Sequence, residues 1–170
     1  MAFCIQCGAK LSDSAKFCGS CGTSVKGVPA SVKVNLSLPD GGVYEGDLID
    51  GIPSGKGKVK WPDGENYTGD FANGTFQGKG KYSFANGDAY EGDYFDGKPH
   101  GKGIYSFANG MYYVGDFANG LKNGSGKMTT AEGDTYEGGF LNDLPHGHGI
   151  MKFADGDVFD GNWENGMIVD

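Results

Sequence analysis

The stretch from Tyr90 to Tyr112 reads YEGDYFDGKPHGKGIYSFANGMY, and its character alternates from one residue to the next. Tyr90, Gly92 and Tyr94 would face one side of an extended chain, and the acids between them the other. This period of two predicts β-strands. An Asp-Gly and an Asn-Gly dipeptide follow the two alternating segments, and both favour tight chain reversal. The stretch is therefore predicted to be one β-hairpin.

The same pattern recurs along the chain with a period of 23 residues. An aromatic residue opens each unit, a glycine follows two positions later, and a large apolar residue two positions after that. The opening aromatics are Tyr44, Tyr67, Tyr90, Tyr113, Tyr136 and Phe159. One hairpin alone is marginally stable in water, so the units are expected to stack side by side. The predicted fold is all-β, an elongated single-layer antiparallel meander.

Charges on the predicted outward positions support this order of strands. The first strand of a unit carries acids such as Glu91 and Asp93, and the second carries lysines such as Lys58 and Lys60. In a meander each acidic strand lies between lysine-bearing strands, and such cross-strand pairs stabilise a sheet by roughly 0.2–1 kcal/mol each. A solvated face that fixes strand order accounts for these charges; a ligand-binding array of charges is the alternative.

The opposite face is predicted to be aromatic. A glycine beside a large ring leaves room for the ring to lie flat over the strand. Two interpretations stay open, since the rings could pack on one another or form a contact surface for a partner. The candidate contact residues are Tyr44, Trp61, Tyr67, Phe84, Tyr90, Phe107, Tyr113 and Tyr136.

The unit Y-x-G-x-[FWY]-x-x-G-x-x-x-G-x-G resembles the MORN repeat, and the stretch 90–112 carries every position of it. The resemblance covers residues 44–170, with five complete units and one half unit. Departures fall in the C-terminal half, where Asp143 replaces a turn glycine, Gly139 and Asn162 replace an aspartate, and Thr130 replaces an aromatic. The resemblance implies a non-enzymatic scaffold or adaptor for protein–protein interaction.

Residues 32–43 look like the missing half of a unit and are predicted to be a capping strand, because terminal repeats must cover the stack. Residues 23–31 would then be a linker, and residues 1–22 a separate small domain.

That small domain contains all of the cysteines, Cys4, Cys7, Cys18 and Cys21, in two C-x2-C pairs. Such pairs on facing turns can place four thiolates around a tetrahedral zinc ion. Two disulfides are the alternative, but they require an oxidising compartment. Residues 3–22 resemble the short zinc ribbons at the N-termini of bacterial proteins. The resemblance implies structural Zn²⁺, because four thiolates leave no coordination position for water.

Composition limits the remaining functions. The net charge is −8 and all 14 basic residues are lysine, which argues against nucleic acid as a partner. No run of about 18 apolar residues and no secretory signal is visible, so a cytoplasmic location is expected. Peripheral binding to acidic phospholipid at a membrane is an alternative that the acidic repeats disfavour, and a targeting subunit for a partner enzyme is another.

Catalytic motifs are not recognised. GKPHGKG at 97–103 lacks the spacing and the hydroxyl residue of a phosphate-binding P-loop, and it recurs in every unit. His100 and His146 share one repeat position, and His148 stands where other units have lysine, so all three are interpreted as turn residues. The sequence therefore predicts no enzyme, and a protein or extended peptide as partner.

An additional expectation concerns the end of the array. Phe159–Trp163 is predicted to be a lone strand with an unpaired edge unless residues 167–170 fold over it. Such an edge could pair with a second copy and form a homodimer.

Overall fold

A computed structural model describes residues 2–3, 10–11 and 34–169. The four cysteines and residues 23–31, predicted to be zinc ligands and linker, lie outside the described residues. Near the N-terminus β1 (Ala2–Phe3) pairs antiparallel with β2 (Lys10–Leu11). Every secondary-structure element of the described residues is a β-strand.

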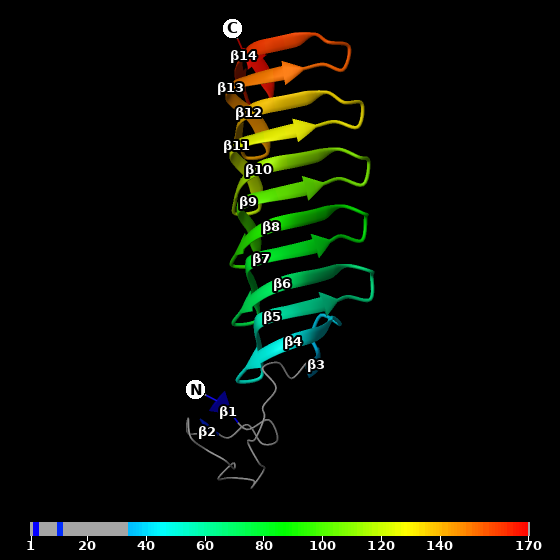
Figure 1. Ribbon diagram of the computed structural model, residues 1–170, viewed down its shortest axis with the longest axis vertical. Coiled ribbons are helices and arrows are strands. Elements are labelled where there is room, and N and C mark those ends of the chain that lie inside the picture. Colours follow the sequence, from blue (N-terminus) through cyan, green and yellow to red (C-terminus); the bar gives the residue numbers. More distant parts are fainter. Residues whose placement is uncertain (1, 4–9, 12–33, 170) are drawn as a thin grey trace.

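The remaining strands form one antiparallel sheet of 13 strands in which every neighbour in space is a neighbour in sequence. Figure 1 shows the strands succeeding one another along the long axis in chain order. The sequence prediction of a single open meander of stacked hairpins is confirmed. The strands are β3 (Val34–Ser37), β4 (Val43–Ile49), β5 (Ile52–Lys60), β6 (Asn66–Ala72), β7 (Thr75–Ser83), β8 (Ala89–Phe95), β9 (Lys98–Ser106), β10 (Tyr112–Ala118), β11 (Leu121–Thr129), β12 (Thr135–Leu141), β13 (Leu144–Lys152), β14 (Val158–Glu164) and β15 (Met167–Val169).

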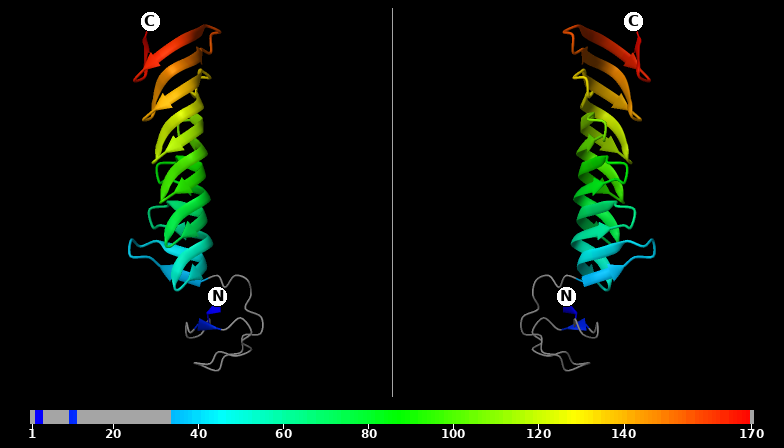
Figure 2. Two further views of the ribbon diagram at one scale, coloured as in Figure 1. Left: turned by 90° about the vertical axis from the view of Figure 1, so that its left-hand side faces the viewer. Right: turned by 90° about the vertical axis from the view of Figure 1, so that its right-hand side faces the viewer.

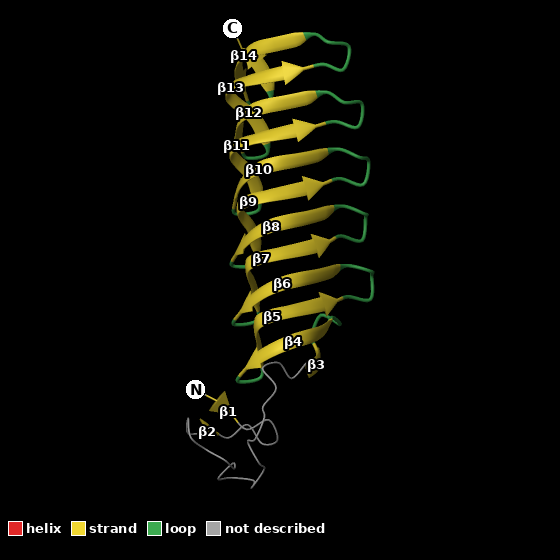
Figure 3. Cartoon of the chain, viewed as in Figure 1, coloured by secondary structure: helices red, strands yellow, loops and turns green. Residues whose placement is uncertain are grey.

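Two kinds of turn alternate along the sheet, and in Figure 3 they lie at opposite ends of the strands. Short turns join the two strands of a unit, and their central residues both take positive φ, as in Asp96 (49°) and Gly97 (76°). This is the geometry of the two-residue hairpin predicted from the Asp-Gly and Asn-Gly dipeptides. Asp143 takes φ 72° where the other units have glycine, so this departure keeps the turn.

Each second strand bends at a glycine in its middle. Gly101 has φ 62°, and the register between β8 and β9 shifts between Gly92 and Asp93. A bulge of this kind bends a strand and increases its twist. Equivalent glycines with positive φ occur at Gly55, Gly78, Gly124 and Gly147. The side views show the result, because the two ends of the strands run in different directions and cross in projection (Figure 2).

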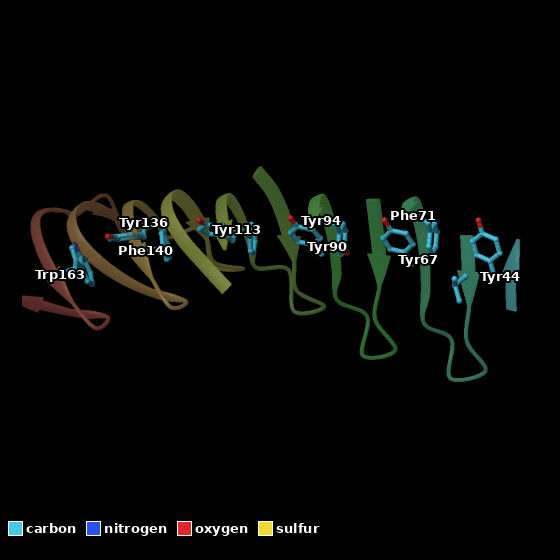
Figure 4. Packing of buried hydrophobic residues seen from close by; sticks show 11 residues of the cluster. Tyr44, Tyr67, Phe71, Tyr90, Tyr94, Tyr113, Tyr136, Phe140 and Trp163 are labelled. Carbon is cyan, nitrogen blue, oxygen red and sulfur yellow. The ribbon is translucent and has the colours of Figure 1, made fainter. Parts of the chain in front are cut away.

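The core lies on the inner side of this bend and is made of the predicted aromatic columns. Tyr44, Tyr67, Tyr90 and Tyr113 have no exposed surface, and Tyr136 is 2% exposed. Figure 4 shows their rings in one row along the array, with Trp163 at its C-terminal end. A single-layer sheet can bury one face only if it curves over that face, and the bulges supply this curvature.

The ends of the array differ from a simple repeat. β3 pairs with β4 at the N-terminal edge, and its residues belong to the predicted capping segment. At the other end β15 pairs with residues 162–164 of β14. The expectation of a lone strand at Phe159–Trp163 is thus corrected by the structure, because residues 167–169 do fold over it.

Candidate functional site

The two faces of the sheet offer different chemistry, and the tyrosine face is closed by its own contacts. Each tyrosine ring meets an aromatic ring of the next unit edge-to-face, as Tyr67 meets Tyr94 with centroids 5.2 Å apart. The other contacts of this aromatic relay are Tyr44–Phe71, Tyr90–Phe117, Tyr113–Phe140 and Tyr136–Trp163, at 4.9–5.0 Å. Edge-to-face pairs of this kind are worth about 0.5–1.5 kcal/mol beyond the area that they bury.

The tyrosine hydroxyls are also satisfied internally. The Tyr90 hydroxyl donates to the backbone carbonyl of Asp93 at 2.9 Å, and the other four tyrosines repeat this bond at 2.6–3.0 Å. Burial raises the pKa of the Tyr44 phenol to about 12, with a smaller contribution from Asp47. The rings therefore remain neutral and act as core.

This burial corrects part of the predicted contact surface. The five tyrosines proposed as partner-binding residues have no ring face left for a partner in this structure. Trp61, Phe84 and Phe107 lie at the rim of the core and are partly exposed. Partner binding by these three stays a prediction.

A ladder of glycines crosses the whole sheet beneath the tyrosine rings. Eleven glycines are direct cross-strand partners of one another from β4 to β14. A Cβ atom on Gly103 would lie 2.6 Å from Cε2 of Tyr90, so the ring occupies the space of a side chain. The glycine ladder comprises Gly46, Gly57, Gly69, Gly80, Gly92, Gly103, Gly115, Gly126, Gly138, Gly149 and Gly161.

On the opposite face the backbone of this ladder forms the floor of a groove with a volume of about 1330 Å³ that crosses β5 to β13. Residues on either side of the ladder form its two walls. The lysine wall consists of Lys56, Lys79, Lys102, Ser125 and His148. The mixed wall consists of Thr68, Lys81, Glu91, Ile104, Val114, Lys127, Glu137 and Ile150.

Aspartates hold the lysine wall in place in the first three units. The Asp93 carboxylate accepts the backbone N–H of Lys102 at 3.2 Å and the Lys79 ammonium at 2.7 Å. The same two contacts recur at Asp70, with Lys79 and Lys56, and at Asp116, with Ser125 and Lys102. Each aspartate therefore links two successive units. The Lys79 hydrogen bond is the main reason why the pKa of Asp93 lies below its usual value.

Exposure within these pairs is uneven. The lysine side chains are 70–73% exposed, whereas the paired aspartates are 30–33% exposed. The carboxylates thus lie closer to the backbone of the sheet, and the ammonium groups project farther into solvent. Five lysines and two glutamates line the groove, and the carboxylates of Asp70, Asp93 and Asp116 beside the lining neutralise Lys56, Lys79 and Lys102.

The lysine wall changes in the fourth unit. Ser125 and Gly139 are direct cross-strand partners where earlier units pair lysine with aspartate. Both members of the ion pair are thus replaced together, and a Cβ on Gly139 would collide with the carbonyl oxygen of His146. In the fifth unit His148 takes the lysine position, and its Nε2 lies 2.9 Å from Oδ1 of Asp160.

The centre of the mixed wall is apolar. Ile104 and Val114 are cross-strand partners, and each is 43% exposed. Ion pairs flank them, Lys81–Glu91 at 3.2 Å on one side and Lys127–Glu137 at 3.8 Å on the other. The groove therefore offers an apolar step between charged segments.

One lysine departs from this arrangement and enters the core face. The Lys122 ammonium lies 5.7–5.9 Å from the ring centroids of Phe107, Tyr113 and Phe140. Burial lowers its pKa, and Asp143 partly opposes that effect. Proline or phenylalanine fills the equivalent place in the other four complete units, so Lys122 acts there as a packing residue with a cation–π contribution.

The groove was missed by sequence reasoning. The lining side chains were recognised as an outward charged face, but alternation alone does not reveal that the face is hollow. Among the described residues no cluster of three His, Cys, Asp or Glu side chains could hold a metal ion. The described part of the chain also has no helix long and apolar enough to cross a membrane.

Fold and repeat geometry define a class of protein, the open single-sheet arrays of stacked β-hairpins. Within this class the MORN repeat matches residues 44–65, 67–89, 90–112, 113–135 and 136–158. The chain belongs to the MORN-repeat family. A zinc-ribbon domain matches residues 3–25.

Comparison with solved structures finds similar folds at low sequence identity. One is the TCP domain of SAS-4 (dCPAP) of Drosophila melanogaster in complex with a proline-rich motif of Ana2, at 14% identity and a TM-score of 0.48, covering 79% of each chain. Another is the TCP10 domain of Danio rerio CPAP in complex with a STIL peptide, at 18% identity and a TM-score of 0.44, covering 79% of this chain and 56% of that one. No curated protein matches the chain.

Proposed function

We propose that the protein is a non-enzymatic adaptor that binds an extended segment of a protein partner along the groove over the glycine ladder. The observation that carries this proposal is the continuity of the groove, which runs across β5 to β13 without interruption. A binding site of this length suits a chain segment better than a small molecule.

The chemistry of the walls supports the same conclusion. Exposed ammonium groups can donate hydrogen bonds to peptide carbonyls or carboxylates, and the Ile104–Val114 step can receive an apolar side chain. The partner would leave the core untouched, since the tyrosine rings contribute nothing to this face. Rigid recognition is expected because the walls are held by the sheet itself.

Selection from a library of random peptides tests this proposal without assuming a sequence. Selected peptides should bind the full chain in fluorescence anisotropy. The double variant Ile104→Glu/Val114→Glu should weaken binding at least about tenfold, since it replaces the apolar step at the centre of the groove by two carboxylates.

A matched control is available on the same face. Val43 and Val158 are 48% and 61% exposed and lie outside the groove lining. The variant Val43→Glu/Val158→Glu should bind as the natural chain does. Equal loss in both double variants, or in neither, would show that the groove is not the binding site.

We also propose that Cys4, Cys7, Cys18 and Cys21 hold one structural Zn²⁺. The paired spacing and the match of a zinc-ribbon domain to residues 3–25 support this assignment. The purified chain should contain one equivalent of zinc by elemental analysis, and Cys7→Ser should lose it. Two disulfides in place of zinc would be seen as an absence of free thiols after metal removal.

A homodimer through the C-terminal edge is the third element of the proposal. β15 is the outer strand there, and its Met167, Ile168 and Val169 side chains are exposed. Light scattering at increasing concentration should show a rise toward twice the chain mass, and Ile168→Lys should prevent it. A constant monomeric mass would contradict this element.

A further inference from the structure

The spacing of the lysine wall carries information about the conformation of its ligand. Lys56, Lys79 and Lys102 occupy the same position in successive units, which lie two strands apart in the sheet. Neighbouring strands are separated by about 4.8 Å, so the wall presents an ammonium group about every 9.6 Å. A ligand that follows the groove must match this interval or lose contact after one or two units.

Few backbone conformations have a repeat of this length with side chains on one face. A β-strand returns to the same face about every 6.8 Å, which drifts out of step within one unit. A polyproline II helix has three residues per turn and a rise of about 3.1 Å, so every third residue returns to the same face after about 9.3 Å. The repeat of a polyproline II helix therefore differs from the lysine spacing by about 0.3 Å per unit.

Charge sets the side chains that face the lysine wall. The three lysines are 70–73% exposed and bind their aspartates through one carboxylate oxygen each, so every ammonium group has further donors directed to solvent. An acidic side chain at every third position would meet them in turn. Positions on the second face of such a helix would meet the apolar Ile104–Val114 step, which favours proline or another apolar residue.

We infer that the groove recognises an acidic polyproline II segment with a carboxylate at every third residue, in register with Lys56, Lys79 and Lys102. This inference rests on the proposed function and specifies its partner. The ammonium groups that such carboxylates would meet are 70–73% exposed and project farther into solvent than the aspartates that pair with them, which are 30–33% exposed.

Three 12-residue peptides with blocked termini test the spacing of the carboxylates separately from their charge. The first is (Pro-Pro-Glu) repeated four times. The second has the same composition with its glutamates in adjacent pairs, Pro-Pro-Glu-Glu-Pro-Pro repeated twice. The third replaces each glutamate of the first by glutamine. In anisotropy titrations of the full chain the first peptide should bind at least about tenfold more tightly than either of the others.

Two triple variants identify the site. Lys56→Gln/Lys79→Gln/Lys102→Gln should weaken binding of the first peptide about tenfold, because three exposed ion pairs are lost at about two- to fivefold each. Lys58→Gln/Lys60→Gln/Lys152→Gln removes the same charge from the same face outside the groove lining, and it should change binding less than twofold. Thermal unfolding of both variants confirms that they remain folded.

Each other outcome has a definite meaning. Equal binding of the first two peptides would overturn the three-residue register and leave the adaptor function intact. Equal binding of the glutamine peptide would overturn the role of charge. If library-selected peptides bind in the groove and no Pro-Pro-Glu peptide does, this inference fails alone. If no peptide binds, but phosphatidylserine vesicles bind and lose binding in the groove variant, both this inference and the proposed function fail.

Discussion

The tyrosine face and the groove face of the sheet are made by adjacent residues of the same strands, yet they differ in almost every physical property. Tyr90 is fully buried and its hydroxyl is bonded internally, whereas Lys102, on the neighbouring strand, exposes most of its side chain to the groove. The first face contributes the core of the array, and the second is the face proposed above to bind the partner. A substitution should therefore affect stability or binding according to its face rather than its chemical type.

The largest contrast is expected between two tyrosines of opposite faces. Tyr90→Ala removes a ring from the relay and should lower the free energy of unfolding by about 3–5 kcal/mol. Tyr112→Ala changes a side chain that is 42% exposed on the groove face and should cost less than about 1 kcal/mol. Urea unfolding followed by tryptophan fluorescence measures both. Similar losses would mean that the faces do not differ as described.

A smaller effect is expected from adding one methyl group to the glycine ladder. Gly103→Ala places a Cβ against the Tyr90 ring and should lower the free energy of unfolding by about 1–3 kcal/mol. In combination with Tyr90→Ala the added cost should largely disappear, because the ring that collides is gone. Full additivity in this double-mutant cycle would contradict the contact.

Alkaline pH should weaken the tyrosine face specifically. Burial holds the pKa of Tyr44 and of Tyr113 at about 12, compared with 10.0 for an unfolded tyrosine. A pKa raised by folding contributes stability that is complete below the unfolded value and is lost as pH rises through the folded value. The urea midpoint should therefore fall from about pH 10 upward. Tyr113→Phe should reduce this slope, and an unchanged slope would show that the phenol is not buried.

The smallest effect is expected on the groove face. Asp93 has a lowered pKa, mainly through Lys79, so its contribution to stability is present above its unfolded value of 3.8 and is lost as pH falls from there through the lower folded-state pKa. Asp93→Asn should cost about 1 kcal/mol or less near neutral pH and should flatten the loss of stability below about pH 4. An unchanged acid slope in Asp93→Asn would contradict the ion pair with Lys79.

The fold could be predicted because every repeat unit carries the same sequence signals. Period two within a unit, turn dipeptides between strands and a constant spacing of 23 residues leave one antiparallel order. The site could not be predicted in the same way. Its floor is the backbone of the glycine ladder, and the alternation of side chains specifies which residues face outward but not that a continuous groove runs between them.

The same limit explains the correction on the aromatic residues. From the sequence, a ring beside a glycine is compatible with packing or with partner contact. In the structure the five tyrosines are packing residues, because the bend brings Phe71, or its equivalent near the tip of the next hairpin, against each ring. The partly exposed Trp61, Phe84 and Phe107 lie near the longer loops, away from the bend.

The aromatic relay also makes the array modular in length. Every unit adds the same increment of about 9.6 Å, and the rings of the relay contact only rings of their own unit and of the adjacent units. Removing residues 90–112 would bring Tyr67 against Phe117 and Lys79 opposite Asp116, contacts of kinds that the chain already contains. The number of units can thus change in evolution or by design without new contacts at the junction, and the length of the proposed groove would change with it.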